Sequence, residues 1–125
     1  GMEKGLLGPH GAVFARRVFG PAEQAALGLP LAEEEGTARR TAHTVASAAA
    51  DFAAKEAFLK AAGTGLREPF SLCEIEAVRL PGGAPAYHFS GRSAQWVEAR
   101  RLRAHLSLSH EDGMAMAYCI LETET

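Results

Sequence analysis

The chain has 125 residues, a length typical of one domain, so we expect a single domain over residues 1–125. Its 47% apolar and 22% charged residues are the balance of a folded protein rather than a disordered one. A formal net charge of −2 excludes the overall basic field of a nucleic-acid binder, and no apolar run approaches the roughly 18 residues of a membrane span.

Short helices are predicted near the start of the chain. Apolar residues favour a helix over Gly11–Val18, which a Gly-Pro pair ends. The proline suits the first turn of a second helix, residues 21–27. Residues 28–36 contain Pro30 and the acidic run 33–35, so we expect a surface loop with a solvated acidic face rather than a metal site.

A long, alanine-rich helix is predicted from about Thr37 to Ala62, with Gly63 ending it. Its larger apolar positions repeat at helical spacing: Val45, Ala49, Phe52 and Leu59. Glu56 falls on this stripe, so we expect its carboxylate to point inward. A carboxylate there must be paired, metal-bound or protonated, because burying a bare charge is costly.

The second half of the chain predicts strands. Ser71–Leu80 alternates at first and, after a Pro-Gly-Gly turn, pairs with Ala86–Phe89 as a hairpin. Gly91–Leu102 predicts a second amphipathic helix. His105–His110 alternates, an Asp-Gly turn follows, and Met114–Leu121 is a last strand. The predicted fold class is α+β, an antiparallel sheet packed on one long helix.

Cys73 and Cys119 both lie in apolar runs that predict strands, without the spacing of a zinc site. We expect buried free thiols of a cytoplasmic protein. Residues 1–5 lack the pattern of a signal peptide, and because Gly1 precedes Met2 we expect the encoded chain to begin at Met2.

Glu56 and Lys60 are four residues apart and therefore neighbours on one helix face. Two interpretations stay open: an exposed ion pair of small energetic value, or a functional pair. The turn Gly63-Thr64-Gly65 follows, which is either a helix cap or a loop whose N–H groups and hydroxyl bind phosphate. In the functional interpretation Glu56 holds Mg²⁺ bridging to a diphosphate, and Lys60 neutralises the remaining charge.

His110 ends a predicted strand beside a tight turn, where side chains often face a cleft. A lone histidine is more often structural or merely exposed. His110 is therefore a candidate site residue only in combination with other signals.

Three segments together resemble one known family. The run FAAKEAFLKAAGTG (residues 52–65), the run HLSLSH (residues 105–110) and the run RVFGPAE (residues 17–23) are similar to the holo-acyl-carrier-protein synthases of the 4′-phosphopantetheinyl transferase superfamily. The resemblance implies that fold and an Mg²⁺-dependent transfer of 4′-phosphopantetheine from coenzyme A to a serine of an acyl carrier protein. It also implies a homotrimer with active sites between subunits.

The same resemblance implies roles for individual residues. Glu56 matches the metal-binding glutamate and candidate base, and Lys60 the catalytic lysine beside the diphosphate. The coenzyme A contacts would come from the glycine turn and the strand end: Gly63, Thr64, Gly65 and His110. Phe14 and Arg17 fall where the family docks the carrier protein, although core packing is an equal alternative for Phe14.

Two departures from the family pattern leave a second function open. The family's first strand carries Gly-x-Asp, whose aspartate is the other metal ligand, whereas Met2–Leu6 here aligns with the helix after that strand. Asp51 also stands where the family usually has an arginine that binds coenzyme A, and it points about 140° away from Glu56. We therefore expect either a misassigned start or a diverged member that binds coenzyme A or a carrier protein without transfer.

Overall fold

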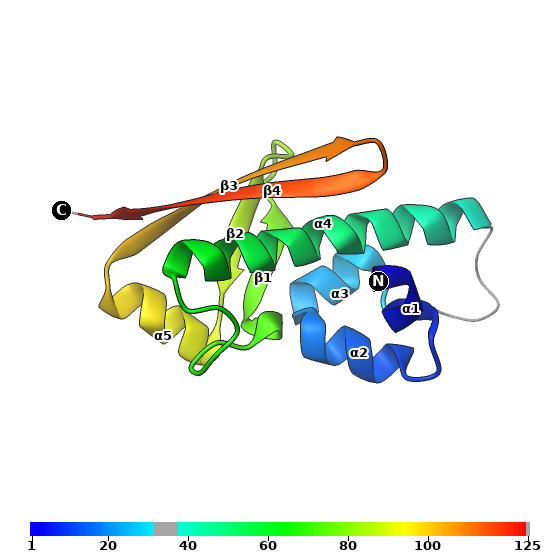
Figure 1. Ribbon diagram of the computed structural model, residues 1–125, viewed down its shortest axis with the longest axis horizontal. Coiled ribbons are helices and arrows are strands. Elements are labelled where there is room, and N and C mark those ends of the chain that lie inside the picture. The colour runs from blue at the N-terminus through cyan, green and yellow to red at the C-terminus, as the bar shows by residue number, and fades with distance from the viewer. Residues whose placement is uncertain (32–37, 125) are drawn as a thin grey trace.

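The structure, a computed structural model, describes residues 1–31 and 38–124 (Figure 1). In the first half these residues form helices α1 (Met2–Leu7), α2 (Gly11–Val18), α3 (Pro21–Leu27) and the long α4 (Ala38–Ala62). The second half contains the 3₁₀ turn η1 (Leu72–Glu74), β1 (Ile75–Arg79), β2 (Pro85–Phe89), α5 (Gly91–Ala99), β3 (Leu102–Glu111) and β4 (Met114–Thr123). Within the described ranges no helix is both long and apolar enough to cross a membrane.

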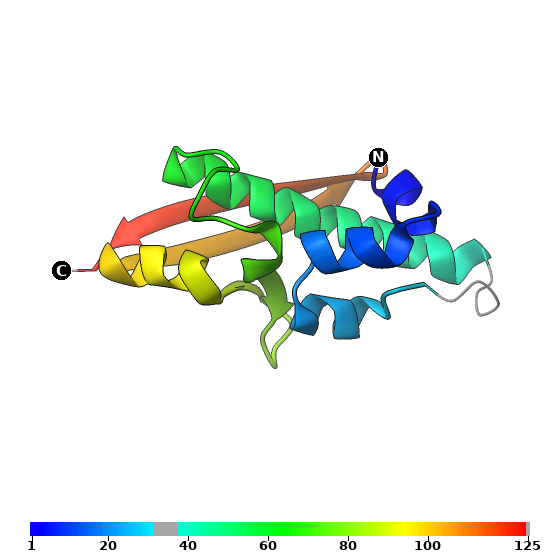
Figure 2. The same ribbon diagram turned by 90° about the horizontal axis from the view of Figure 1, so that it is seen from below.

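Helix α4 is the axis of the arrangement. The short helices α1 to α3 lie beside its first half, and the β3–β4 hairpin runs along its other side (Figures 1 and 2). The predicted bounds of α2 and α3 are confirmed, and α4 is described from Ala38 to its predicted end at Ala62, while its predicted first residue lies outside the described residues. The predicted loop 28–36 and its acidic run lie mostly outside the described residues.

The strands form two separate antiparallel ladders rather than the single sheet that the sequence predicted. In one ladder Ile75 pairs with Phe89, and in the other Leu102 pairs with Thr123. β3 crosses β2 at a steep angle instead of lying alongside it, so no ladder joins the two hairpins (Figure 1). The coarser prediction of an α+β fold with one long helix is confirmed.

Several predicted boundaries were wrong, and three of them change the assignment of an element. Ser71–Leu80 begins with η1, so Cys73 lies in a 3₁₀ turn rather than a strand. The second amphipathic helix ends at Ala99, not Leu102, because Arg101 adopts a positive φ of 54° that breaks the helix. β3 consequently begins three residues before His105.

The core consists of two apolar clusters on either side of the middle of α4. The first joins α1, α2 and α4 and contains Leu6, Ala15, Val18, Phe19 and Ala48. The second joins α4, α5 and the strands and contains Phe58, Leu59, Phe70, Ile75 and Val97. Both cysteines are free, as predicted, but half-buried rather than buried.

Candidate functional site

Glu56 is exposed, so the prediction that it faces inward was wrong. The buried stripe of α4 runs one residue earlier along the helix: Thr44, Ala48, Asp51, Lys55 and Phe58. The physical reason is the composition of α4, whose small alanines occur on every side and blur the apolar periodicity. The long side chains of Phe52 and Leu59 shifted the predicted stripe towards Glu56, although Phe52 itself is only half-buried.

Glu56 and Lys60 line one small cavity of about 210 Å³ at the end of α4. Its apolar wall and its glycine turn complete the lining: Phe52, Leu59, Leu72, Gly65 and Leu66. None of the ion pairs among the described residues joins Glu56 to Lys60. Carboxylate and ammonium are thus both available to a molecule that enters the cavity.

The glycine turn folds the chain back over the end of α4. Gly63 and Gly65 have φ values of 78° and 63°, a conformation that favours glycine. The N–H groups of both residues donate to the carbonyl of Leu59, and the Thr64 hydroxyl donates to the carbonyl of Gly65 at 3.0 Å. Gly65 is a lining residue of the cavity, whereas Gly63 and Thr64 lie beside it in the turn.

His110 does not lie in this cavity. It is exposed near the turn of the β3–β4 hairpin, which lies over the beginning of α4, whereas Gly63–Gly65 follow the end of α4 (Figure 1). One chain therefore does not bring His110 to Glu56 and Lys60.

Phe14 and Arg17 lie on α2, at the outer side of the first core cluster. Phe14 is half-buried and packs edge-to-face on Phe19 with ring centroids 6.5 Å apart. A Cβ at Gly5 would lie 2.6 Å from the Phe14 ring, so the ring occupies the space that the glycine leaves. Core packing thus accounts for most of the Phe14 surface, while the neighbouring Arg17 is exposed.

The charged atoms of the cavity fit a magnesium ion only together with a substrate. Mg²⁺ is commonly held by one or two carboxylates plus substrate phosphates and water. Glu56 supplies one hard oxygen ligand, and the described residues contain no group of three or more His, Cys, Asp or Glu side chains that could hold a metal. Asp51 lies on a different face of α4, so it is not the second ligand.

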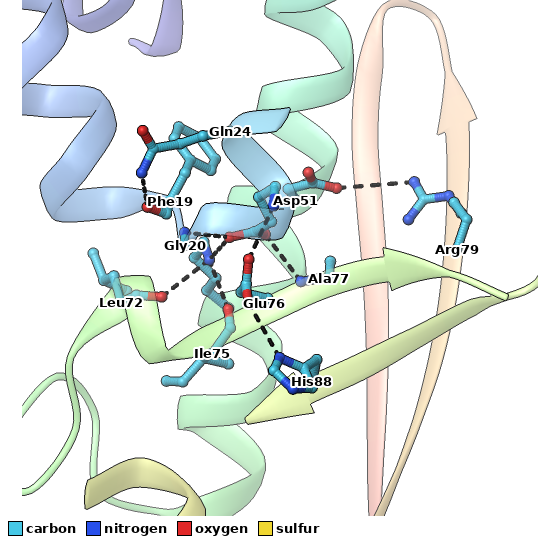
Figure 3. A network of polar contacts seen from close by, with 12 residues as sticks. Phe19, Gly20, Gln24, Asp51, Leu72, Ile75, Glu76, Ala77, Arg79 and His88 are labelled. Carbon is cyan, nitrogen blue, oxygen red and sulfur yellow. Dashed lines mark hydrogen bonds and ion pairs between the residues drawn. The ribbon is translucent and has the colours of Figure 1, made fainter. Parts of the chain in front are cut away.

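A buried polar cluster, which the sequence did not predict, lies where α4 meets α3, η1 and β1 (Figure 3). Lys55 is fully buried and donates to Glu23 Oε1, to the Leu72 carbonyl at 3.0 Å and to the Ile75 carbonyl at 2.6 Å. Burial raises the pKa of Glu23 and lowers that of Lys55, and the charge of each opposes the shift of the other. Glu76 Oε2 accepts the backbone N–H of Glu23 at 2.9 Å. We call Glu23, Lys55 and Glu76 the interior cluster.

Asp51 borders the interior cluster. Its carboxylate is almost fully buried and lies 3.9 Å from the half-exposed guanidinium of Arg79. Burial, reinforced by the charge of Glu23, raises the pKa of Asp51 to about 7. Asp51 and Arg79 also line a second cavity of about 420 Å³ between α3, α4 and β1. Asp51 is thus separated from the Glu56 cavity, as its 140° offset on the helix indicated.

A weak signal for the interior cluster was present in the sequence. Asp51 and Lys55 are four residues apart and continue the spacing of Ala48, while Glu23 occupies the third position of a helix that begins after Gly20. Glu23 Oε1 accepts the Gly20 N–H at 3.1 Å, as a capping residue does. The partners of Lys55 could not be predicted, because they come from distant segments.

Comparison with known proteins agrees with this geometry. Residues 3–119 match the family model described as the 4′-phosphopantetheinyl transferase superfamily. Because the match covers most of the chain, the protein belongs to this superfamily.

The most similar proteins define the family more narrowly. A holo-[acyl-carrier-protein] synthase of Bordetella pertussis is 40% identical over 117 residues, which are 93% of this chain and 72% of that protein. The crystal structure of the Neisseria meningitidis holo-[acyl-carrier-protein] synthase matches 97% of this chain and 91% of its own with a TM-score of 0.73 and 28% identity. A Bacillus anthracis synthase in complex with CoA (3′,5′-ADP) matches 90% of this chain and 82% of its own with a TM-score of 0.67 and 29% identity. The chain belongs to the holo-[acyl-carrier-protein] synthase family, as its motifs predicted.

Proposed function

We propose that the chain, as one domain, transfers 4′-phosphopantetheine from coenzyme A to a serine of an acyl carrier protein. The observation that carries this proposal is the cavity in which Glu56, Lys60 and Gly65 meet. A carboxylate, an ammonium and a glycine turn are what a diphosphate ester and an attacking hydroxyl require. The bound nucleotide of the Bacillus anthracis relative supports coenzyme A as the donor.

In the proposed reaction the serine oxygen attacks the β-phosphate of coenzyme A. The new serine O–P bond forms as the P–O bond to the leaving phosphate breaks, and 3′,5′-ADP departs. Glu56 accepts the serine proton directly or through a water molecule, and Lys60 stabilises the charge that develops on the diphosphate oxygens. Gly63, Thr64 and Gly65 would border the diphosphate, and the two glycines, which lack a Cβ, would let the phosphates approach the backbone closely.

We propose that Mg²⁺ is required. Glu56 would hold it together with the diphosphate oxygens, and a bound Mg²⁺ ion would neutralise charge on the transferred group. Removing divalent cations with EDTA should stop transfer, and Mg²⁺ should restore it. Transfer that persists in EDTA would remove the metal from the proposal.

The carrier protein is proposed to dock on α2. Arg17 is exposed there beside the half-buried Phe14, and carrier proteins are acidic, so an arginine on this helix attracts them despite the slightly negative chain. Exchanging Arg17 for Glu should raise the KM for the carrier and leave the KM for coenzyme A unchanged.

A homotrimer with shared active sites is also proposed. The outward face of β4 presents four large apolar side chains, of which Met114, Tyr118 and Ile120 are 68%, 64% and 66% exposed and Met116 is 40% exposed. An exposed apolar stripe of this size is typical of a protein interface. In a trimer His110 of a neighbouring copy could reach the coenzyme A cavity. Light scattering should report three copies, and Ile120→Arg should dissociate them.

The deciding experiment is a transfer assay with purified chain, coenzyme A, Mg²⁺ and an apo-acyl carrier protein. Mass spectrometry should show the carrier gaining one phosphopantetheine group. The alternative, a member that binds without transfer, predicts binding of coenzyme A by calorimetry and an unchanged carrier mass. The cytoplasmic location expected from the sequence stays a prediction.

A further inference from the structure

The interior cluster connects the two surfaces that the proposed function assigns to the two substrates. Lys55 directly precedes Glu56 on α4, but it lies about 100° further round the helix and is buried, whereas Glu56 is exposed. Its ammonium donates to the carbonyl of Leu72, and Leu72 is one of the residues that line the Glu56 cavity. Lys55 thus fixes one wall of the coenzyme A cavity to the helix that carries Glu56 and Lys60.

The same ammonium reaches the carrier-docking segment. Its partner Glu23 accepts the N–H of Gly20, and Gly20 lies two residues after the end of α2. Glu23 Oε2 also accepts the N–H of Ala77 at 2.9 Å, which ties α3 to β1. Glu76 completes the connection by accepting the N–H of Glu23.

The α2–α3 junction is held closely against this part of the chain. A Cβ added at Gly20 would lie 2.4 Å from Glu76 Cδ and 2.5 Å from the Cys73 carbonyl oxygen. The junction therefore has little room to shift while the interior cluster is intact (Figure 3).

We propose that the interior cluster is a positioning unit that aligns the carrier-docking helix α2 with the coenzyme A cavity. This inference rests on the proposed function. None of the three side chains lines the Glu56 cavity, so they act through the groups that they hold in place. Misplacing reacting groups by about 1 Å can lower a rate by about a hundredfold, so this alignment is worth a measurable part of kcat.

A purely stabilising role makes a different prediction. It would lower the fraction of folded molecules and leave kcat per folded molecule unchanged. A positioning role lowers kcat per folded molecule and keeps both KM values, because each docking surface is itself intact.

The test is the double variant Lys55→Met with Glu23→Gln, which removes both charges of the buried ion pair together, while Glu76 keeps its contact with His88 Nδ1 at 3.2 Å. The amide oxygen that this change places at position 23 can still accept one of the two backbone N–H groups that Glu23 serves. We expect kcat per folded molecule to fall by about a hundredfold, with unchanged KM for coenzyme A and for the carrier. The concentration of folded sites is obtained by calorimetric titration with coenzyme A.

The control is Val97→Ala, a cavity-forming change on α5 outside the interior cluster. It should lower the unfolding temperature while keeping kcat. A wild-type kcat in the double variant, or an equal loss of kcat in the control, would overturn the positioning role.

A milder variant covers the case in which the double variant does not fold. Glu76→Gln keeps an acceptor for the Glu23 N–H but removes the charge, so kcat should fall less, with the same unchanged KM values. An altered KM for coenzyme A, or no change in kcat, would overturn the inference. If the wild-type chain binds both substrates but transfers nothing, the proposed function and the inference are both refuted. If the wild type transfers the group and the variants do so at the same rate, only the inference is refuted.

Discussion

Lys55 and Glu56 are neighbours in α4 and lie in opposite environments. Lys55 is 0% exposed and bound to three oxygen acceptors, whereas Glu56 is exposed beside Lys60 in an open cavity. Charge in the interior cluster is costly to bury and therefore almost fully paired. Charge in the cavity has no partner among the described ion pairs and remains available to a ligand. In this helix the buried charge is held by partners within the same chain, whereas the exposed charge stays available to a ligand and is therefore the candidate for the proposed chemistry.

The largest effect is expected on the cavity side. Exchanging Glu56 for Gln keeps size and shape but removes the proton acceptor, so transfer should fall by about 10²- to 10⁴-fold. Because Glu56 is exposed, the free energy of unfolding should stay the same within about 0.5 kcal/mol. Glu98→Gln, the same change at an exposed position of α5, is the control and should keep full activity. Full activity of the Glu56 variant would contradict its assigned role.

In the interior cluster we expect a large loss of stability, in contrast to the unchanged stability expected for the Glu56 variant. Replacing Lys55 with Met leaves the buried Glu23 carboxylate without its cation, and the free energy of unfolding should fall by about 3–5 kcal/mol. Urea unfolding at constant pH measures this loss. Lys60→Met is a matched control five residues further on, and at its exposed position it should change stability by less than about 0.5 kcal/mol. Equal losses in the two variants would show that Lys55 is not a buried structural cation.

Much of this fold could be predicted from the sequence, because its signals are local. Pro21 and Gly63 delimit α3 and α4, and an Asp-Gly pair forms the turn of the last hairpin. The spacing of Glu56, Lys60 and Gly65 along one helix and its turn was enough to place them together.

The orientation of α4 and the interior cluster could not be predicted. Alanines occur on every side of α4, so its apolar residues do not mark one face clearly. The predicted buried stripe therefore lay one residue from the observed one. The partners of Lys55 come from α3, η1 and β1, and only the tertiary fold brings those segments together. A sequence pattern also favours apolar residues for the interior, whereas here Asp51 and Lys55 occupy it.

Asp51 allows the cost of interior charge to be measured against pH. Its pKa is raised from 3.8 to about 7, so between these values the folded chain holds a proton that the unfolded chain has lost. The contribution of the Asp51 carboxyl to the free energy of unfolding is therefore fully present at low pH, and it is lost as the pH rises towards 7. The Asp51→Asn variant lacks this charge. At pH 8 its free energy of unfolding should exceed that of the wild type by up to about 4 kcal/mol, and at pH 4 the two should be almost equal.

Thermal or urea unfolding of both proteins across pH 4–8 measures this difference. Asp112→Asn is the control, because Asp112 is exposed in the turn of the last hairpin and asparagine tolerates its positive φ. A stability difference between Asp51→Asn and wild type that does not grow with pH would show that Asp51 is not a buried, destabilising charge.

The smallest effect concerns the cation that faces Asp51 from β1. Arg79 lowers the pKa of Asp51 against the stronger effect of burial, but it lies 3.9 Å away and is 46% exposed, so solvent weakens the attraction. Exchanging Arg79 for Gln should destabilise the protein by about 0.5–1 kcal/mol at pH 8, where Asp51 is ionised. At pH 4 the carboxyl is protonated in the folded chain, so the same change should cost nothing. In an Asp51→Asn background the loss at pH 8 should vanish, and a loss that persists there would show that Arg79 stabilises the fold independently of Asp51.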